Sequence, residues 1–312
     1  MQTLFNIINI PFGWALEFLS SLFGGNFAAA VFFFTLLINV ILIPLSIKSQ
    51  KSSVQQTRIK PKLDELKKKY GDDKQKYSEA MQKLYQEENV SMSGGCLPMV
   101  LRLVLMMSIY YLSMSPLTYL LHIDSATVTA AAEALGKNAN ARAELQIIEA
   151  VRNGTIDFPQ IASKLSAIDF NFFGIDLTQT PKFSFDIFHD AQPIWVMPII
   201  AFLAQMLTSA LSLVMQKKLN PDAPNMAGMM LTMPLLSLFI GFTLPGGVAF
   251  YWACSSLIGG LIQVGVQQFY GPQKMLSRER LKELNKECDF EENQLKKIKT
   301  YQTLLNGEAA EK

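Results

Sequence analysis

One arginine stands inside an apolar segment, and its side chain has the clearest potential for chemistry in the chain. Arg102 lies within residues 94–122, and none of the apolar segments contains an acidic residue that could pair with it. A guanidinium at mid-bilayer costs about 2.5–3.5 kcal/mol on insertion scales, so it normally faces water or a partner. The sequence therefore predicts a water-filled groove around Arg102. The alternative is that the side chain snorkels to the headgroups.

Uncharged polar residues also fall inside the apolar segments. Gln205 lies well inside one of them, and Trp252 and Ser256 lie inside the last. Serine in a membrane helix more often packs or bonds to backbone than lines a cavity. Trp252 suits either a groove wall or an interfacial aromatic belt. These residues are candidates for the groove, with helix packing as the alternative.

Covalent catalysis and metal binding find no support in the sequence. The apolar segments hold no Ser–His pair, no pair of aspartates and no His–Glu cluster. The three cysteines lack the spacing of metal ligands. We therefore expect no enzyme activity, no catalytic residue, no metal and no cofactor.

Composition places the chain in a membrane. Of its 312 residues 50% are hydrophobic and only 17% are charged, against about 25% charged in soluble domains. A membrane-spanning helix needs about 20 apolar residues. Five blocks satisfy this length and are predicted spans one to five: 27–47, 94–122, 193–216, 226–244 and 245–270. The sequence thus predicts an all-α polytopic membrane protein.

The remaining segments also have recognisable patterns. Residues 1–26 carry apolar side chains three and four positions apart, which predicts an amphipathic helix in the membrane interface. A non-cleaved anchor is the alternative. Residues 48–93 read as a helical hairpin, because Gly71-Asp72-Asp73 is a turn signal that supplies an N-cap for the second helix. Pro61 predicts a kink or restart in the first helix.

The long segment 123–192 is predicted to be an extracytoplasmic loop with a helical insertion. Its Ala-rich part, 126–152, predicts one or two short helices that end at Asn153-Gly154. The Phe-rich part, 170–188, is expected to lie against the outer leaflet.

The distribution of Lys and Arg predicts the orientation of the chain. Residues 48–93 hold 11, the short loop 217–225 holds two and the tail 271–312 holds nine. Residues 1–47 hold none, and residues 123–192 hold five beside nine acidic residues. The N-terminus is therefore predicted outside and the C-terminal tail, helical from Lys274 to about Leu305, in the cytosol. The location is a plasma or inner membrane.

Several short runs, taken in order, resemble the YidC/Oxa/Alb family of membrane protein insertases. These runs are Pro44-Leu45-Ser46, Gly94-Gly95-Cys96-Leu97-Pro98, Asn220-Pro221, Met233-Pro234, and Leu244-Pro245-Gly246-Gly247 with Tyr251-Trp252. The resemblance covers residues 1–122 and 168–270 and is to the bacterial type without the large periplasmic domain. Residues 125–166 look like an insertion that the family does not usually carry.

The resemblance implies both a fold and a function. It implies five helices around a hydrophilic groove in which a basic residue attracts the acidic tails of nascent membrane protein clients. The protein would insert these clients and help them fold without covalent chemistry. The hairpin would receive clients, the hairpin and tail would contact the ribosome or signal-recognition machinery, and the Sec translocon is a further expected partner. No sequence-specific nucleic-acid binding is expected. The alternative function is a channel or small-anion transporter, against which the absence of inverted repeats argues.

The sequence departs from the family pattern at the groove charge. The family usually has an arginine five residues before the proline that ends the first span, where this chain has Asn39. It usually has glutamine four residues after the proline of the second span, where this chain has Arg102. Both positions lie about 13 Å from the cytosolic end at about 1.5 Å per residue. We expect Arg102 to replace the missing charge. The predicted groove residues are Arg102, Asn39, Gln205, Trp252 and Ser256.

Overall fold

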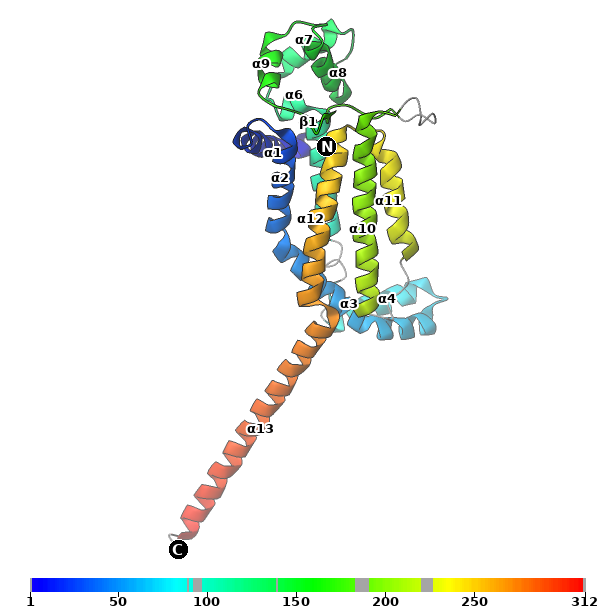
Figure 1. Cartoon of the computed structure of the whole chain (residues 1–312). Helices are drawn as coiled ribbons and strands as arrows, with labels where there is room; N and C mark the ends of the chain where they lie inside the picture. The colour runs from blue at the N-terminus through cyan, green and yellow to red at the C-terminus, as the bar shows by residue number, and fades with distance from the viewer. Residues whose placement is uncertain are drawn as a thin grey trace. The chain divides into compact units, whose positions relative to one another are not determined.

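The computed structural model of the chain describes residues 2–88, 90–91, 97–138, 140–182, 191–219 and 227–310, most of them in helices. Contacts divide the chain into two compact units. The first unit comprises Met1–Ser49 and Ser91–Gly265, and the second comprises Gln50–Val90 and Val266–Lys312. Figure 1 shows the elements of both units in order along the chain.

Helix α1, Gln2–Leu22, packs against α2, Phe27–Ile41, and α5, Leu97–Met114. Part of the apolar stripe predicted for residues 1–26 faces these partners, since Leu16 is buried. A second apolar stripe is exposed: Ile7, Ile10, Trp14, Phe18 and Leu22. The helix is therefore apolar on its protein side and on its open side.

The first predicted span, 27–47, is broken. Helices α2 and α3, Ile43–Tyr70, meet at Leu42 with a bend of 50°. The cause is Pro44, which has no N–H for the helical hydrogen bond and whose ring clashes with the carbonyl four residues earlier. The predicted restart at Pro61 is wrong, because α3 continues through this residue to Tyr70.

Three further helices complete the apolar part of the first unit: α10, Val196–Leu219, preceded by the turn η1, Pro193–Trp195, then α11, Ala227–Gly241, and α12, Gly246–Tyr270, which belongs to this unit as far as Gly265. Helix α10 packs closely on both others. A Cβ at Gly241 would lie 2.9 Å from Pro198, and a Cβ at Gly260 would lie 2.3 Å from Thr208. Small residues let membrane helices approach in this way.

Length and composition identify two candidate membrane spans among the described residues, Pro193–Met215 and Gly246–Tyr270. The bent pair α2–α3 adds a third if it is counted as one span. The described apolar parts of α5 and α11, Leu103–Met114 and Met230–Gly241, are shorter.

Helices α7 to α9 form the insertion, and the short helix α6, Pro116–Tyr119, precedes it. The helices of the insertion are α7, Ser125–Ala134; α8, Ala141–Arg152; and α9, Pro159–Ser166. One or two short helices were predicted within 126–152, and the structure has two, α7 and α8. Helix α8 ends at Asn153 and Gly154, as expected, with Gly154 at a φ of 68°.

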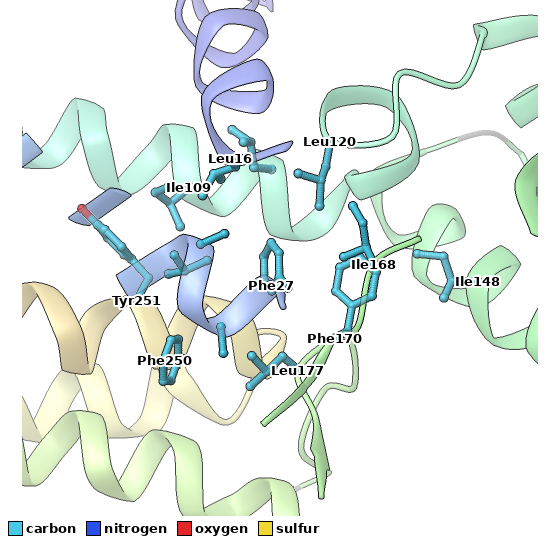
Figure 2. Packing of buried hydrophobic residues seen from close by; sticks show 14 of the residues in the cluster. Leu16, Phe27, Ile109, Leu120, Ile148, Ile168, Phe170, Leu177, Phe250 and Tyr251 are labelled. Carbon is cyan, nitrogen blue, oxygen red and sulfur yellow. The ribbon is translucent and has the colours of Figure 1, made fainter. Parts of the chain in front are cut away.

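One hydrophobic core joins the insertion to the apolar helices of the first unit. It runs from Leu16 and Phe27 through Leu120 to Ile148 and also includes Phe170 (Figure 2). A two-stranded antiparallel hairpin, β1, Asn171–Phe172, and β2, Ile175–Asp176, lies next to this core. Residues 183–188 of the predicted Phe-rich segment lie outside the described residues.

The second unit contains most of α3, helix α4, Lys74–Glu87, and helix α13, Pro272–Ala310. The side chain of Asp73 accepts a hydrogen bond from the backbone N–H of Lys76, which confirms the predicted N-cap. Lys62 forms an ion pair with Glu88 across the hairpin. Helix α13 confirms the predicted helical tail.

Candidate functional site

A cavity of about 630 Å³ lies among α5, α10, α11 and α12 in the first unit. Helix α12 contributes one face at spacings of three and four residues: Val248, Tyr251, Trp252, Ser255 and Ser256. The facing helices contribute Met106, Met107 and Tyr110 from α5, Gln205 from α10, and Met233, Leu236, Ser237 and Ile240 from α11. Leu244 completes the described lining.

The polar groups of this cavity are incompletely satisfied. The Ser237 hydroxyl lies 2.8 Å from Oε1 of Gln205 and 2.8 Å from the carbonyl oxygen of Pro234. The indole Nε1 of Trp252 is buried and lacks a hydrogen-bond partner among the described residues. One buried donor is therefore unpaired in a wall that also carries the hydroxyl groups of Ser237, Ser255 and Ser256.

The structure brings together three of the five predicted groove residues, Gln205, Trp252 and Ser256, around this cavity. Asn39 is not in the described lining. It lies half-buried on α2, and its amide donates to the carbonyl oxygen of Thr35 at 2.8 Å. Position 102 belongs to α5, one helical turn before Met106, but the Arg102 side chain lies outside the described part of the chain.

The methionines of the wall were not among the predicted groove residues. Met106, Met107 and Met233 all line the cavity, and 15 methionines occur in the chain. A flexible, polarizable thioether suits a surface that accepts varied partners. The signal in the sequence was the abundance of methionine, which by itself also suits lipid-facing surface.

The described residues contain no cluster of potential metal ligands. Within the described residues no group of three or more His, Cys, Asp or Glu side chains could hold a metal ion. The lining of the cavity combines hydroxyl, amide and indole groups with thioethers. Such an arrangement can hold water or a polar segment of another chain, but it offers no nucleophile–base pair.

Apolar helices of membrane-spanning length, with a partly polar cavity between helices of one bundle, define a helical membrane protein. Residues 18–274 match the model of a family described as 60Kd inner membrane protein. The chain therefore belongs to this family, the YidC/Oxa/Alb family of membrane protein insertases.

Curated relatives are similar over most of the chain. A membrane protein insertase YidC 2 of Listeria innocua is 26% identical over 261 residues, which are 82% of this chain and 68% of the relative. A membrane protein insertase YidC of Fusobacterium nucleatum is 24% identical over 240 residues, 77% of this chain and 85% of the relative. One from Dechloromonas aromatica is 25% identical over 254 residues, and the match spans 34% of that longer protein.

Proposed function

We propose that this protein inserts integral membrane proteins into the bilayer and helps them fold, using the cavity among α5, α10, α11 and α12 as the passage for polar client segments. The observation that carries the proposal is the unpaired indole donor of Trp252 in a methionine-rich wall that also contains Gln205 and Ser256. A buried donor without a partner is costly. A client segment or water that enters the cavity supplies the missing acceptor.

The proposed architecture has five spans, 27–47, 94–122, 193–216, 226–244 and 245–270, that enclose a hydrophilic groove. The N-terminus lies outside, and the hairpin 48–93, the loop 217–225 and the tail 271–312 are cytosolic. The concentration of Lys and Arg in these three segments supports this orientation.

The charge of the groove is assigned to Arg102. Position 102 is four residues before Met106, so both positions belong to one face of α5. Asn39, where the family usually has its arginine, is bonded to its own helix. An arginine in a water-filled groove attracts the acidic tail of a client and then releases it, because no covalent bond forms.

The second unit is proposed to meet the partners of insertion. Its hairpin receives clients, and its hairpin and tail contact the ribosome or signal-recognition machinery, with the Sec translocon as a further partner. Helix α13 supports this role, because the apolar side chains of Leu281, Leu284, Leu295 and Ile298 are exposed along it.

The test is reconstitution into liposomes with a Sec-independent, single-span client that has an acidic translocated tail. We expect protease-protected tails with the purified chain and only background with protein-free liposomes. Ser256→Trp fills the cavity and should block insertion, whereas Ser163→Trp on the exposed surface of α9 should not. Background-level insertion by the wild-type chain would overturn the proposal. Anion flux without insertion would identify a transporter instead.

A further inference from the structure

The hairpin β1–β2 carries a strained aromatic residue at its tip. Phe173 and Gly174 join the two strands with φ angles of 49° and 83°. Positive φ at both central residues is the type I′ turn, which favours Asn-Gly because bulky side chains rarely adopt this conformation. Phe173 nevertheless occupies the first position and is 93% exposed. Such strain is typical of functional sites rather than of ordinary turns.

A second cavity, of about 500 Å³, lies under this hairpin. Its walls come from the start of α2, the hairpin and α12: Asn26, Ala28, Ala29, Phe32, Phe33, Asn171, Phe172, Phe173, Phe250 and Cys254. None of these side chains is that of Asp, Glu, Lys, Arg or His. Its volume lies within the range of about 300–1,000 Å³ that is usual for ligand sites. The lining selects an uncharged, apolar ligand.

The exposed surface of α2 beside this cavity is apolar, as expected of a surface that contacts lipid. Phe32 and Phe33 at its wall are 40% exposed, and the exposed apolar face continues along the helix through Leu36, Leu37, Val40 and Ile41. Helices α2 and α3 together form a candidate membrane span. Phe32 and Phe33 therefore belong both to the wall of the cavity and to an exposed apolar face of a candidate span.

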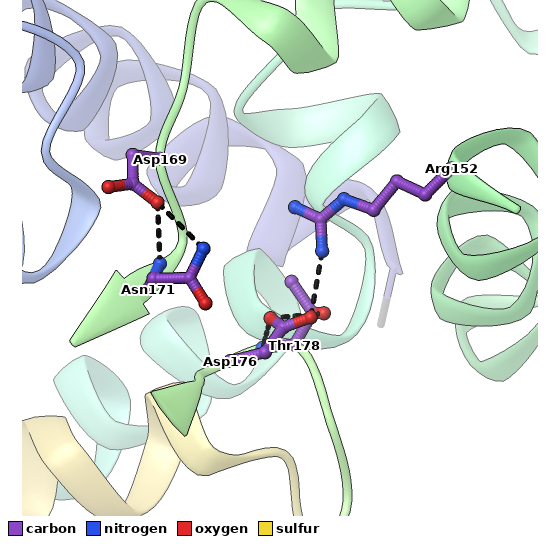
Figure 3. Close-up of polar contacts among 5 residues, drawn as sticks. All are labelled: Arg152, Asp169, Asn171, Asp176 and Thr178. Carbon is purple, nitrogen blue, oxygen red and sulfur yellow. Dashed lines mark hydrogen bonds and ion pairs between the residues drawn. The ribbon is translucent and has the colours of Figure 1, made fainter. Parts of the chain in front are cut away.

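The hairpin is held firmly at the start of α2. The backbone N–H of Phe27 donates to the carbonyl oxygen of Asp169 at 3.0 Å. The backbone N–H of Asp169 donates to the carbonyl oxygen of Gly25 at 2.8 Å. Oδ1 of Asp169 also accepts from the backbone and side chain of Asn171 at 2.9 and 3.0 Å (Figure 3). These bonds fix the height of Phe173 relative to the span.

Arg152 holds the other strand. Its guanidinium donates to Asp176 at 2.8 Å (Figure 3). The same guanidinium lies 5.5 Å from the centre of the Phe170 ring. Arg152 therefore links α8 of the insertion to the hairpin. These contacts on both strands hold the exposed ring of Phe173 at a fixed position, as a membrane anchor requires.

We propose that the hairpin tip and the cavity beneath it form a phospholipid-binding surface, with the Phe173 ring seated in the bilayer and one acyl chain in the cavity. The proposed insertase function requires no such site. The proposed orientation serves only to assign the surface to the outer leaflet.

Depth measurement tests the position of the ring. Phe173→Cys and, as control, Gln160→Cys on exposed α9 are made in a chain whose native cysteines are replaced, spin-labelled, and reconstituted in phosphatidylethanolamine–phosphatidylglycerol vesicles. We expect the label at 173 to collide more with oxygen than with a water-soluble nickel chelate, and the label at 160 to show the reverse. Nickel-dominated collisions at position 173 would overturn the proposal.

Lipid-dependent stability tests the binding. Phe173→Asn creates the favoured Asn-Gly turn, so it should melt at a higher temperature than the wild type in detergent. It should nevertheless gain less when phospholipid is added. Equal gains would overturn the proposal, and crosslinking of two chains through Phe173→Cys would instead assign the surface to a second copy. Neither the depth of the label nor the lipid-dependent melting temperature depends on client insertion. Insertion assays on the same samples therefore show separately whether the proposed function fails.

Discussion

The cavity among α5, α10, α11 and α12 and the helical insertion α7–α9 belong to one unit, but their buried polar groups differ in whether they have hydrogen-bond partners. In the cavity, the indole donor of Trp252 has no partner among the described residues. In the insertion, the buried carboxylate of Glu144 accepts from the N–H of Thr118 at 3.1 Å and from its hydroxyl at 2.7 Å. The hydrogen bonds of Glu144 stabilise the fold of the insertion. The unpaired donor in the cavity remains free to bind another molecule.

Packing gives the same contrast. Ile147 and Ile161 in the insertion are fully buried, and cores of branched aliphatic residues are close-packed and costly to alter. The cavity is lined instead by Met106, Met107 and Met233, whose side chains adapt to different neighbours. Natural proteins depart from full polar satisfaction and dense packing mainly at functional sites. The comparison therefore predicts that changes in the groove alter activity and changes in the insertion alter stability.

The largest effect is expected at Arg102. Unit charges about 4 Å apart attract by roughly 4 kcal/mol at an effective dielectric near 20, whereas about 1.4 kcal/mol already corresponds to a tenfold change. Arg102→Ala should therefore reduce insertion of acidic-tailed clients by roughly tenfold or more. Its melting temperature should stay at the wild-type value. Both quantities are measured on the same reconstituted sample.

Two matched variants make the Arg102 test specific. Arg102→Lys should retain part of the activity, because a point charge suffices where no bidentate partner is required. The double variant Asn39→Arg with Arg102→Gln should recover activity, since it restores the usual family arrangement. Normal insertion of acidic-tailed clients by Arg102→Ala would show that Arg102 has a structural or snorkelling role.

Glu144 should give the largest effect on stability. Glu144→Ala removes the acceptor for both donors of Thr118 in a buried place and should destabilise the insertion by about 2 kcal/mol. Hydrogen exchange of the α8 amides measures this loss, because it reports local opening. Insertion activity below the melting transition should be unchanged. A loss of activity without faster exchange would break the contrast between the two regions.

The pH dependence of this site has a definite sign. Burial raises the pKa of Glu144 above its ordinary value of 4.5, and the hydrogen bonds from Thr118 oppose this shift. A raised folded-state pKa means that the folded state binds the proton more tightly than the unfolded state. The stabilisation that the folded state gains from protonated Glu144 is thus complete below pH 4.5. It is lost as the pH rises through the folded-state pKa. Glu144→Gln should lack this dependence.

The sequence could predict the faces of single helices but not the pairing of side chains between helices. Trp252 and Ser256 are four residues apart, so their shared face followed from helical periodicity. The contact of Ser237 with Gln205 joins residues 32 positions apart, and no local pattern reveals it. The bend at Leu42 was readable from Pro44. The type I′ turn was not, because Phe-Gly lacks the usual Asn-Gly signal.

The smallest effect expected is at the N-cap of α8. Oδ1 of Asn140 accepts from the backbone N–H of Ala143 at 2.9 Å and thereby satisfies one of the free donors of the first turn. Asn140→Ala should cost about 1 kcal/mol, seen as faster hydrogen exchange in the first turn of α8 alone. Asn140→Asp keeps an acceptor at this position and should exchange like the wild type. If instead Asn140→Ala impaired insertion while leaving exchange unchanged, the insertion would take a direct part in handling clients, and its separation from the groove would be wrong.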